Sequence, residues 1–350
     1  MYIKMPKISL MIHTASPDNF LINQGLNSYF KSLIHCLNYQ TFKDFELVYV
    51  DTYYEENKNL FNKLNNNFLI KHVPIHENHR YWYDKGYCFI SAAKNTGILY
   101  ADGDLLITCD DAEFFPENFL DNYWNHYKNG YYQLAVHKRL KNINIQDNLP
   151  LLPINGESYI NDHRLLNAKC DIYCHKHGNW AFAGTSFSLS DALILNGFNE
   201  KMDGCKSLED CDFGNRLVML GRSFVTDKNG YCYILDHKSY GDVSSTHWDN
   251  LIPEDCQQKE EIIKKKNIEN FIAVENYGVL KCAEELYELK ANKSKITSKH
   301  LNIIQQATIK YRHFDPLADD NKEKLNIWLG TPNFDLIEER EELRKREWKW

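Results

Sequence analysis

Short apolar segments alternate with amphipathic ones over the first 110 residues, and this alternation constrains the fold more than any other feature of the chain. The segments with strand character are residues 7–13, 46–50, 68–74 and 104–109, and those with helical spacing are residues 27–39, 55–65 and 91–100. Strands that are apolar along their whole length are typical of parallel sheets covered by helices on both faces. The sequence therefore predicts an α/β fold with a mostly parallel sheet and flanking helices.

The rest of the chain is less regular. We expect residues 130–180 to form loops over the sheet edge, followed by the helices 189–196 and 211–220 and the strand 231–236. From about residue 254 the pattern changes to amphipathic helices with a strongly charged end, at 254–266, 279–290, 298–311 and the last dozen residues. This change predicts one domain over residues 1–250 and a helical C-terminal extension over 251–350.

Composition excludes several classes of protein. With 43% hydrophobic and 25% charged residues the chain is an ordinary globular protein, and its net charge of −7 argues against binding a phosphate backbone through bulk charge. No segment approaches the roughly 18 apolar residues of a membrane helix, and the initial apolar run is too short for a signal peptide. The ten scattered cysteines fit reduced thiols. We expect a cytoplasmic protein, with peripheral contact to a membrane left open.

Polar residues follow three of the predicted strands: Thr14, Asp51 and the pair Asp110 and Asp111. Ligands of open α/β sheets bind at the carboxyl ends of the strands. Adjacent carboxylates repel each other, and a divalent cation beside them keeps both ionised. Such oxygen ligands suit Mg²⁺ or Mn²⁺ bound to a diphosphate. The structural alternative is a solvated acidic loop before a helix N-terminus.

A second acidic group stands where a late helix begins, with Glu209, Asp210 and Asp212 within four residues. One interpretation is an acidic first turn that the helix dipole stabilises by about 0.3–1 kcal/mol per charge. The other is a carboxylate that takes a proton from a sugar hydroxyl.

Residues 9–116 resemble the nucleotide-sugar half of an inverting family 2 glycosyltransferase of the GT-A fold. The pieces that carry the resemblance are ISLMIHTAS (8–16), FKSLIHCLNYQTFKDFELVYVD (30–51), AAKNTG (92–97) and CDDAEFFP (109–116). The second half, residues 117–250, resembles the C-terminal region of β-1,4-galactosyltransferases and chondroitin polymerases. Its pieces are FAGTS (182–186), NGF (196–198) and GCKSLEDCDFGNRL (204–217). Their order and spacing agree over about residues 7–240.

For the donor, the resemblance implies a nucleotide sugar, with UDP as the nucleotide. Asp51 would bind the uracil edge and Thr14 would help to seat the nucleoside. Lys94 and Asn95 would lie near the diphosphate. Cys109 and Lys94 depart from the Asp and Arg of the family motifs.

For the metal, the resemblance implies Mn²⁺ or Mg²⁺ with Asp111 as a direct ligand. Asp110 would face the ribose or the waters of the metal. A histidine after a late strand would complete the metal site, either His237 or His247.

For the acceptor, a glycan or another molecule with a hydroxyl group, the resemblance implies that Glu209 orients it and Asp210 is the general base. One direct displacement would then invert the anomeric centre.

Other interpretations remain open at this point. A nucleotidyltransferase would carry a Gly-rich basic loop after the first strand, and residues 14–19 do not. A non-catalytic nucleotide-sugar-binding protein, or a transferase acting on a modified DNA base, would use the same fold. Two further segments each allow two interpretations. Cys170, Cys174, His175 and His177, with His163 nearby, form either a zinc cluster or a plain loop. Residues 79–83 form either a loop that covers the donor or part of the packed core.

Overall fold

The computed structural model describes the residues 6–14, 26–59, 61–75, 90–111, 113–140, 158–160, 171–175, 184–195, 197–198 and 209–235. The predicted helical extension 251–350, the candidate ligands His237 and His247, and the segment 79–83 lie outside these residues. Within the described part of the chain, no helix has the length and hydrophobicity to cross a membrane.

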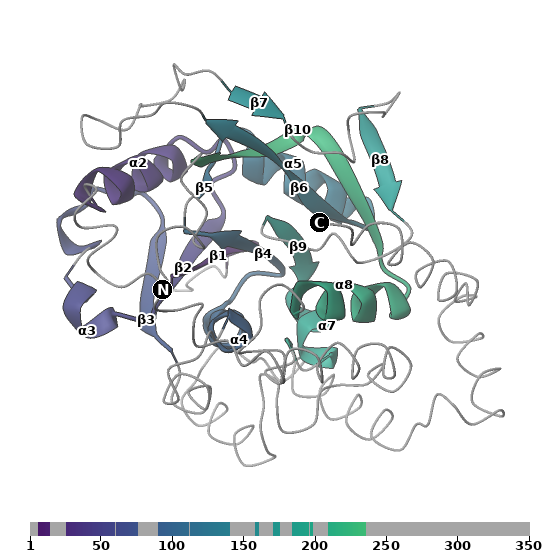
Figure 1. Ribbon diagram of the computed structural model, residues 1–350, viewed down its shortest axis with the longest axis horizontal. Coiled ribbons are helices and arrows are strands. Elements are labelled where there is room, and N and C mark those ends of the chain that lie inside the picture. The colour runs from purple at the N-terminus through teal and green to yellow at the C-terminus, as the bar shows by residue number, and fades with distance from the viewer. Residues whose placement is uncertain are drawn as a thin grey trace, which may run out of the picture.

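The first sheet has the strand order β3-β2-β1-β4-β9 (Figure 1). Its parallel strands are β1 (Ile8–Thr14), β2 (Phe45–Asp51), β3 (Leu69–Pro74) and β4 (Leu105–Asp110). The short strand β9 (Thr185–Ser188) pairs with β4 in the antiparallel direction. Nearly every side chain of β1, β2 and β4 is buried, which explains their continuous apolar sequence. The predicted α/β fold class with a mostly parallel sheet is confirmed.

The path of the chain reverses within this sheet. It moves outward from β1 to β3 and then returns to β4 on the other side of β1. Right-handed crossovers therefore place α2 (Leu26–Asn38) and α4 (Ile90–Tyr100) on opposite faces. The carboxyl ends of β1 and β4 flank the point of reversal, where open α/β sheets form their binding crevice.

The helix predicted over 55–65 is much shorter than expected. It consists of α3 (Tyr54–Asn57) and a 3-10 turn at Phe61–Lys63. Asparagine side chains compete with the helical backbone for hydrogen bonds, and this segment is rich in them. Asn62, for example, donates to the Asn59 side chain instead of continuing a helix.

Where the structure describes residues 130–180, at 130–140, 158–160 and 171–175, strands of a second sheet stand in place of the predicted loops. Its strands are β5 (Glu113–Phe114), β10 (Ser223–Leu235), β6 (Tyr131–Leu140) and β7 (Ser158–Ile160), in that order, with β8 (Ile172–His175) beside β10. β6 mixes polar and apolar residues and pairs in parallel with β10, far along the chain. Without a local apolar run, and with a distant partner, β6 gives little signal in the sequence.

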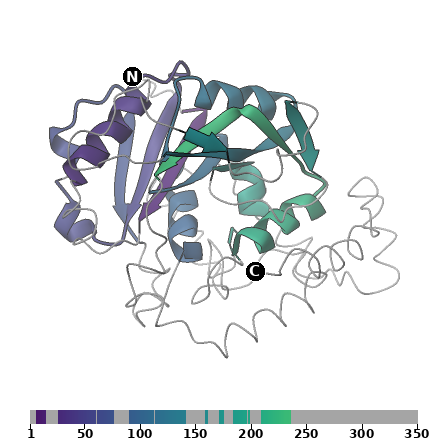
Figure 2. The same cartoon turned by 45° about the horizontal axis from the view of Figure 1, so that its top comes forward.

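Three helices accompany the second half: α5 (Phe119–Lys128), α7 (Leu189–Ile194) and α8 (Glu209–Met219). Figure 2 shows the second sheet next to the first. Gly184, in the FAGTS piece, allows this close approach. Its φ is +75°, and a Cβ atom there would lie 2.2 Å from the Cβ of Ala135 on β6. A larger residue would push the two sheets apart.

Some residues of the family-like pieces serve the fold rather than the site. Glu46 is fully buried at the amino end of β2, where it accepts hydrogen bonds from Ser9 Oγ (2.6 Å) and Asp102 N (2.7 Å) and pairs with Lys71. Gln40 donates to the Pro116 carbonyl at 2.7 Å, so it links α2 to the segment after β4.

Candidate active site

The carboxyl ends of the parallel strands bring the predicted polar residues together. In the strand register Thr14 lies opposite Asp51, and His13 lies opposite Asp110. Thr14 Oγ1 donates a hydrogen bond of 2.7 Å to Oδ2 of Asp111, 97 residues away. The predicted grouping of these side chains at one edge of the sheet is therefore present.

Asp51 is buried and held from two sides. Its Oδ1 accepts the Tyr53 N–H at 2.8 Å, and its Oδ2 lies 2.9 Å from Nε2 of His72 on β3. The His72 ring packs against three aromatic rings, at 5.7, 4.9 and 5.0 Å between centroids, from Tyr49, Tyr54 and Phe61. His72 is a site residue beyond those predicted, and its place near the end of the neighbouring strand is the sequence signal that marks it.

Lys94 on α4 contacts the acidic start of α8. Its buried ammonium lies 3.2 Å from Oε1 of Glu209 and makes a direct ion pair and hydrogen bond with Oδ1 of Asp210. This lysine therefore joins the first 116 residues to the part of the chain that follows them.

The turn at residues 195–198 holds the two helices in place. Asn95, one residue after Lys94, donates to the Phe198 carbonyl (2.9 Å) and accepts from the Phe198 N–H (2.7 Å). Arg216 on α8 donates to the carbonyls of Leu195 (3.0 Å) and Gly197 (2.8 Å). Since both helices are anchored to the same turn, Lys94 is directed at the acids of α8. The Asn95 amide, expected near a diphosphate, is engaged in this anchoring.

Burial and repulsion between carboxylates change the acidity of the site. Burial raises the pKa of Asp110 to about 8, with Glu113, Asp111 and Asp210 adding to the increase and Lys94 opposing it. Burial and then Glu209 raise the pKa of Asp210 to about 7, against the effect of Lys94.

The pKa values of the two basic groups, Lys94 and His13, shift in opposite directions. Burial alone would lower the pKa of Lys94, but the charges of Asp210 and Glu209 outweigh burial and raise it. Burial, together with the nearby Lys94 ammonium, lowers the pKa of His13 to about 3. His13 is therefore neutral near pH 7, while Lys94 is charged.

The donor set suits a divalent cation. In the part of the chain that the structure describes, Asp210, Glu209 and Asp110 act on the Lys94 ammonium, and Asp111 and Glu113 in turn lie within electrostatic range of Asp110. Negative charge is in excess there, and carboxylate oxygens are the ligands that Mg²⁺ and Mn²⁺ prefer. Asp110 and Asp111 are the residues that fit such an ion.

We expect the metal-free protein to become less stable as the pH rises from 6.5 to 8. The folded-state pKa values of Asp110 and Asp210 lie above the 3.8 of free Asp, so folding retains protons that unfolding releases. His13 acts in the opposite direction only below 6.5, where the unfolded histidine becomes protonated. Thermal melts in EDTA should show that Tm falls as the pH rises from 6.5 to 8, and Tm should depend less on pH in Asp110→Asn. A Tm that is constant or that rises over this range would contradict the raised pKa values of the two aspartates.

The suggested zinc cluster at 170–177 is not supported by the two of its residues that the structure describes. Cys174 and His175 are neighbours on β8, so their side chains point to opposite faces. Cys174 is exposed, whereas His175 is buried with Nε2 2.6 Å from Thr226 Oγ1. These two side chains do not converge on one ion.

Comparison with known proteins gives only distant structural similarity. No protein-family model and no curated protein matches the chain. The crystal structure of TarS from S. aureus is similar with 16% identity and a TM-score of 0.45, covering 85% of this chain and 44% of that chain. A structure of residues 1–349 of S. aureus TarS is similar with 17% identity and a TM-score of 0.44, covering 91% and 77%. This chain thus spans less than half of the first of these proteins, and its function has to be inferred from its own site.

Proposed function

We propose that the protein is an inverting glycosyltransferase that moves a sugar from a UDP-sugar to a hydroxyl of a glycan or another acceptor. The observation that carries the proposal is that the Lys94 ammonium pairs with Asp210 at the start of α8 and also lies within electrostatic range of Asp110 at the end of β4. A carboxylate with a pKa of about 7 lies beside carboxylates suited to a cation, at the reversal point of the sheet. A general base works best with a pKa near the working pH.

The donor is bound at the carboxyl ends of β1, β2 and β4. Asp51 accepts the imide N–H of the uracil ring, and His72 keeps its carboxylate in place. Thr14 holds Asp111 in position through their hydrogen bond. Mn²⁺ or Mg²⁺ held by Asp110 and Asp111 would neutralise charge on the diphosphate.

The acceptor reacts above the start of α8. Glu209 orients the acceptor, and Asp210 takes the proton from its hydroxyl as the oxygen attacks the anomeric carbon. The new carbon–oxygen bond forms on the face opposite the leaving diphosphate, whose bond to the sugar breaks, so the anomeric centre inverts. Lys94 holds Asp210 in the orientation needed for this proton transfer, and Asn95 positions Lys94. Positioning and preorganised charge supply most of the rate enhancement.

A thermal-shift screen of nucleotide sugars, with and without Mn²⁺, tests the proposal and identifies the donor. A donor at 100 times its Kd should stabilise the protein by about 2.7 kcal/mol. The donor found in this way is then incubated with Mn²⁺ while release of UDP is measured. Stabilisation without any UDP release would favour a non-catalytic binding protein.

We expect UDP to bind tightly only when Mn²⁺ or Mg²⁺ is present, since the excess of carboxylates otherwise repels the diphosphate. Calorimetry of UDP binding with Mn²⁺ and with EDTA measures the difference. Asp111→Asn is the matched variant and should bind UDP weakly in both buffers. Equal affinity of the unaltered protein in both buffers would contradict the metal assignment.

We also propose that residues 251–350 form a separate helical extension without a catalytic residue. Their amphipathic pattern and mixed charges suit packing or contact with a partner. A chain ending at residue 250 should keep UDP release at a level similar to that of the full chain. A truncated protein that shows a native circular-dichroism spectrum but has lost UDP release would contradict this division.

A further inference from the structure

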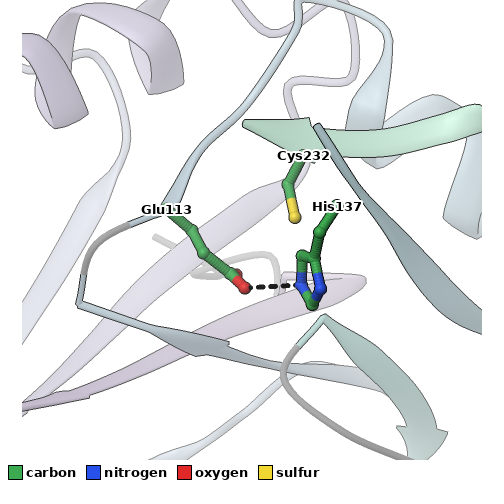
Figure 3. Close-up of side chains that lie close together, drawn as sticks. All are labelled: Glu113, His137 and Cys232. Atoms are coloured by element: carbon green, nitrogen blue, oxygen red, sulfur yellow. Dashed lines mark hydrogen bonds and ion pairs between the residues drawn. The ribbon is translucent and has the colours of Figure 1, made fainter. Parts of the chain in front are cut away.

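Three side chains that could bind a metal converge on the second sheet. Glu113 on β5, His137 on β6 and Cys232 on β10 each offer one ligand atom, and these atoms lie within 4.8 Å of one another. Figure 3 shows the three side chains pointing toward a common centre, with Oε1 of Glu113 3.0 Å from Nε2 of His137. They come from three strands and are separated by up to 119 residues (113 to 232), so the tertiary structure alone brings them together.

The carboxylate of this group is incompletely satisfied. Glu113 is fully buried, and within the described residues its second oxygen, Oε2, has no hydrogen-bond partner. The adjoining thiols of Cys109 and Cys232 are weak hydrogen-bond donors to this carboxylate, so its buried oxygen recovers little of the hydration that it has lost. A cation at the centre of the group would remove this cost.

Two buried thiols adjoin the same carboxylate. Both thiols are fully buried and lie within interaction range of Glu113. A thiol that coordinates a metal ion loses its proton and becomes a negatively charged ligand.

We propose that Glu113, His137 and Cys232 form a zinc site, separate from the Asp110 and Asp111 pair. One carboxylate oxygen, one imidazole nitrogen and one thiolate are a ligand set typical of Zn²⁺, whereas Mg²⁺ and Mn²⁺ prefer oxygen alone. Bonds of about 2.0–2.3 Å require only small movements of side chains that already lie this close. The bound ion would link β5, β6 and β10 directly after the acidic end of β4. This proposal does not depend on the proposed glycosyl transfer.

The test is a titration of the full chain with Co²⁺ after metal removal by a chelator. We expect one equivalent of Co²⁺ to give a thiolate-to-cobalt charge-transfer band, which Zn²⁺ then abolishes by displacement. The Asp110 and Asp111 pair offers carboxylate oxygens and no thiolate, so it cannot produce such a band, and Asp111→Asn should retain the band. Cys232→Ser should lose it, whereas Cys36→Ser, a buried thiol elsewhere, and Cys174→Ser, an exposed one, should retain it.

A second variant keeps the test decisive if Cys232→Ser fails to fold. The His137 side chain is 27% exposed, so His137→Ala should fold normally by circular dichroism. We expect its zinc affinity to fall by more than the roughly 10–100-fold typical of losing a group that only supports a ligand. No band in the unaltered protein, a band that survives both substitutions, or a band lost only in Cys174→Ser would overturn the proposal. The last result would assign zinc to the cysteines near β8 instead.

Discussion

Asp210→Asn should lower kcat for sugar transfer by about 10²-fold or more while the fold and the affinity for UDP are kept. The amide has nearly the same shape as the carboxylate and still accepts the hydrogen bond from Lys94. It cannot take the proton of the acceptor hydroxyl, so only the chemical step is impaired. Transfer rate, Tm and UDP affinity are measured on the same preparation.

Glu209→Gln is the matched control, one residue away and bound to the same lysine. Because its proposed role is orientation, it should raise the KM for the acceptor as well as lower the rate. If both acids only begin a helix, each variant should lose at most about 1 kcal/mol of stability and neither should affect turnover selectively. Near-normal transfer by Asp210→Asn would rule it out as the base.

Lys94→Met should lower the free energy of unfolding by about 3–5 kcal/mol, the range for breaking a buried ion pair by removing one partner. Its side chain is 4% exposed and faces Glu209 and Asp210, which would be left as buried, uncompensated charges. Urea unfolding followed by circular dichroism measures the loss. The pKa of Asp210 points the same way. Burial and Glu209 disfavour the charged form of Asp210, and Lys94 is the group that stabilises it.

Two comparisons separate this effect from a general cost of removing a lysine. Lys58→Met breaks an exposed ion pair with Glu55 and should change stability by no more than about 1 kcal/mol. Adding Asp210→Asn to Lys94→Met removes one of the uncompensated charges and should restore part of the loss. A loss for Lys94→Met no larger than that for Lys58→Met would contradict the proposed role of this ion pair.

The first sheet was predictable because its signals are local. Each of β1, β2 and β4 is buried on both faces, so an unbroken apolar run marks it, and the polar residue that follows marks the edge where ligands bind. Thr14, Asp51 and Asp110 were identified in this way. The helices α2 and α4 also lie within one residue of the expected bounds.

The second sheet was not predictable to the same degree. The sequence predicts only the last part of β10, and it predicts loops at β6, because these strands carry mixed sequences and pair across about 90 residues. The approach of Glu113, His137 and Cys232 depends on that pairing. For the same reason their grouping is not visible in the sequence.

By itself, the sequence determined that β1, α2, β2, β3, α4 and β4 follow one another along the chain and which strand ends carry the acids, because apolar periodicity and chain direction are properties of short segments. Only the tertiary structure decided that Lys94 contacts Asp210, 116 residues away, and that Asn95 binds a backbone turn instead of facing the ligand crevice. Those contacts depend on how α4 and α8 pack against one turn. The pKa values of Asp110 and Asp210 depend on the burial and charge that this packing produces, and neither quantity is encoded in any single segment.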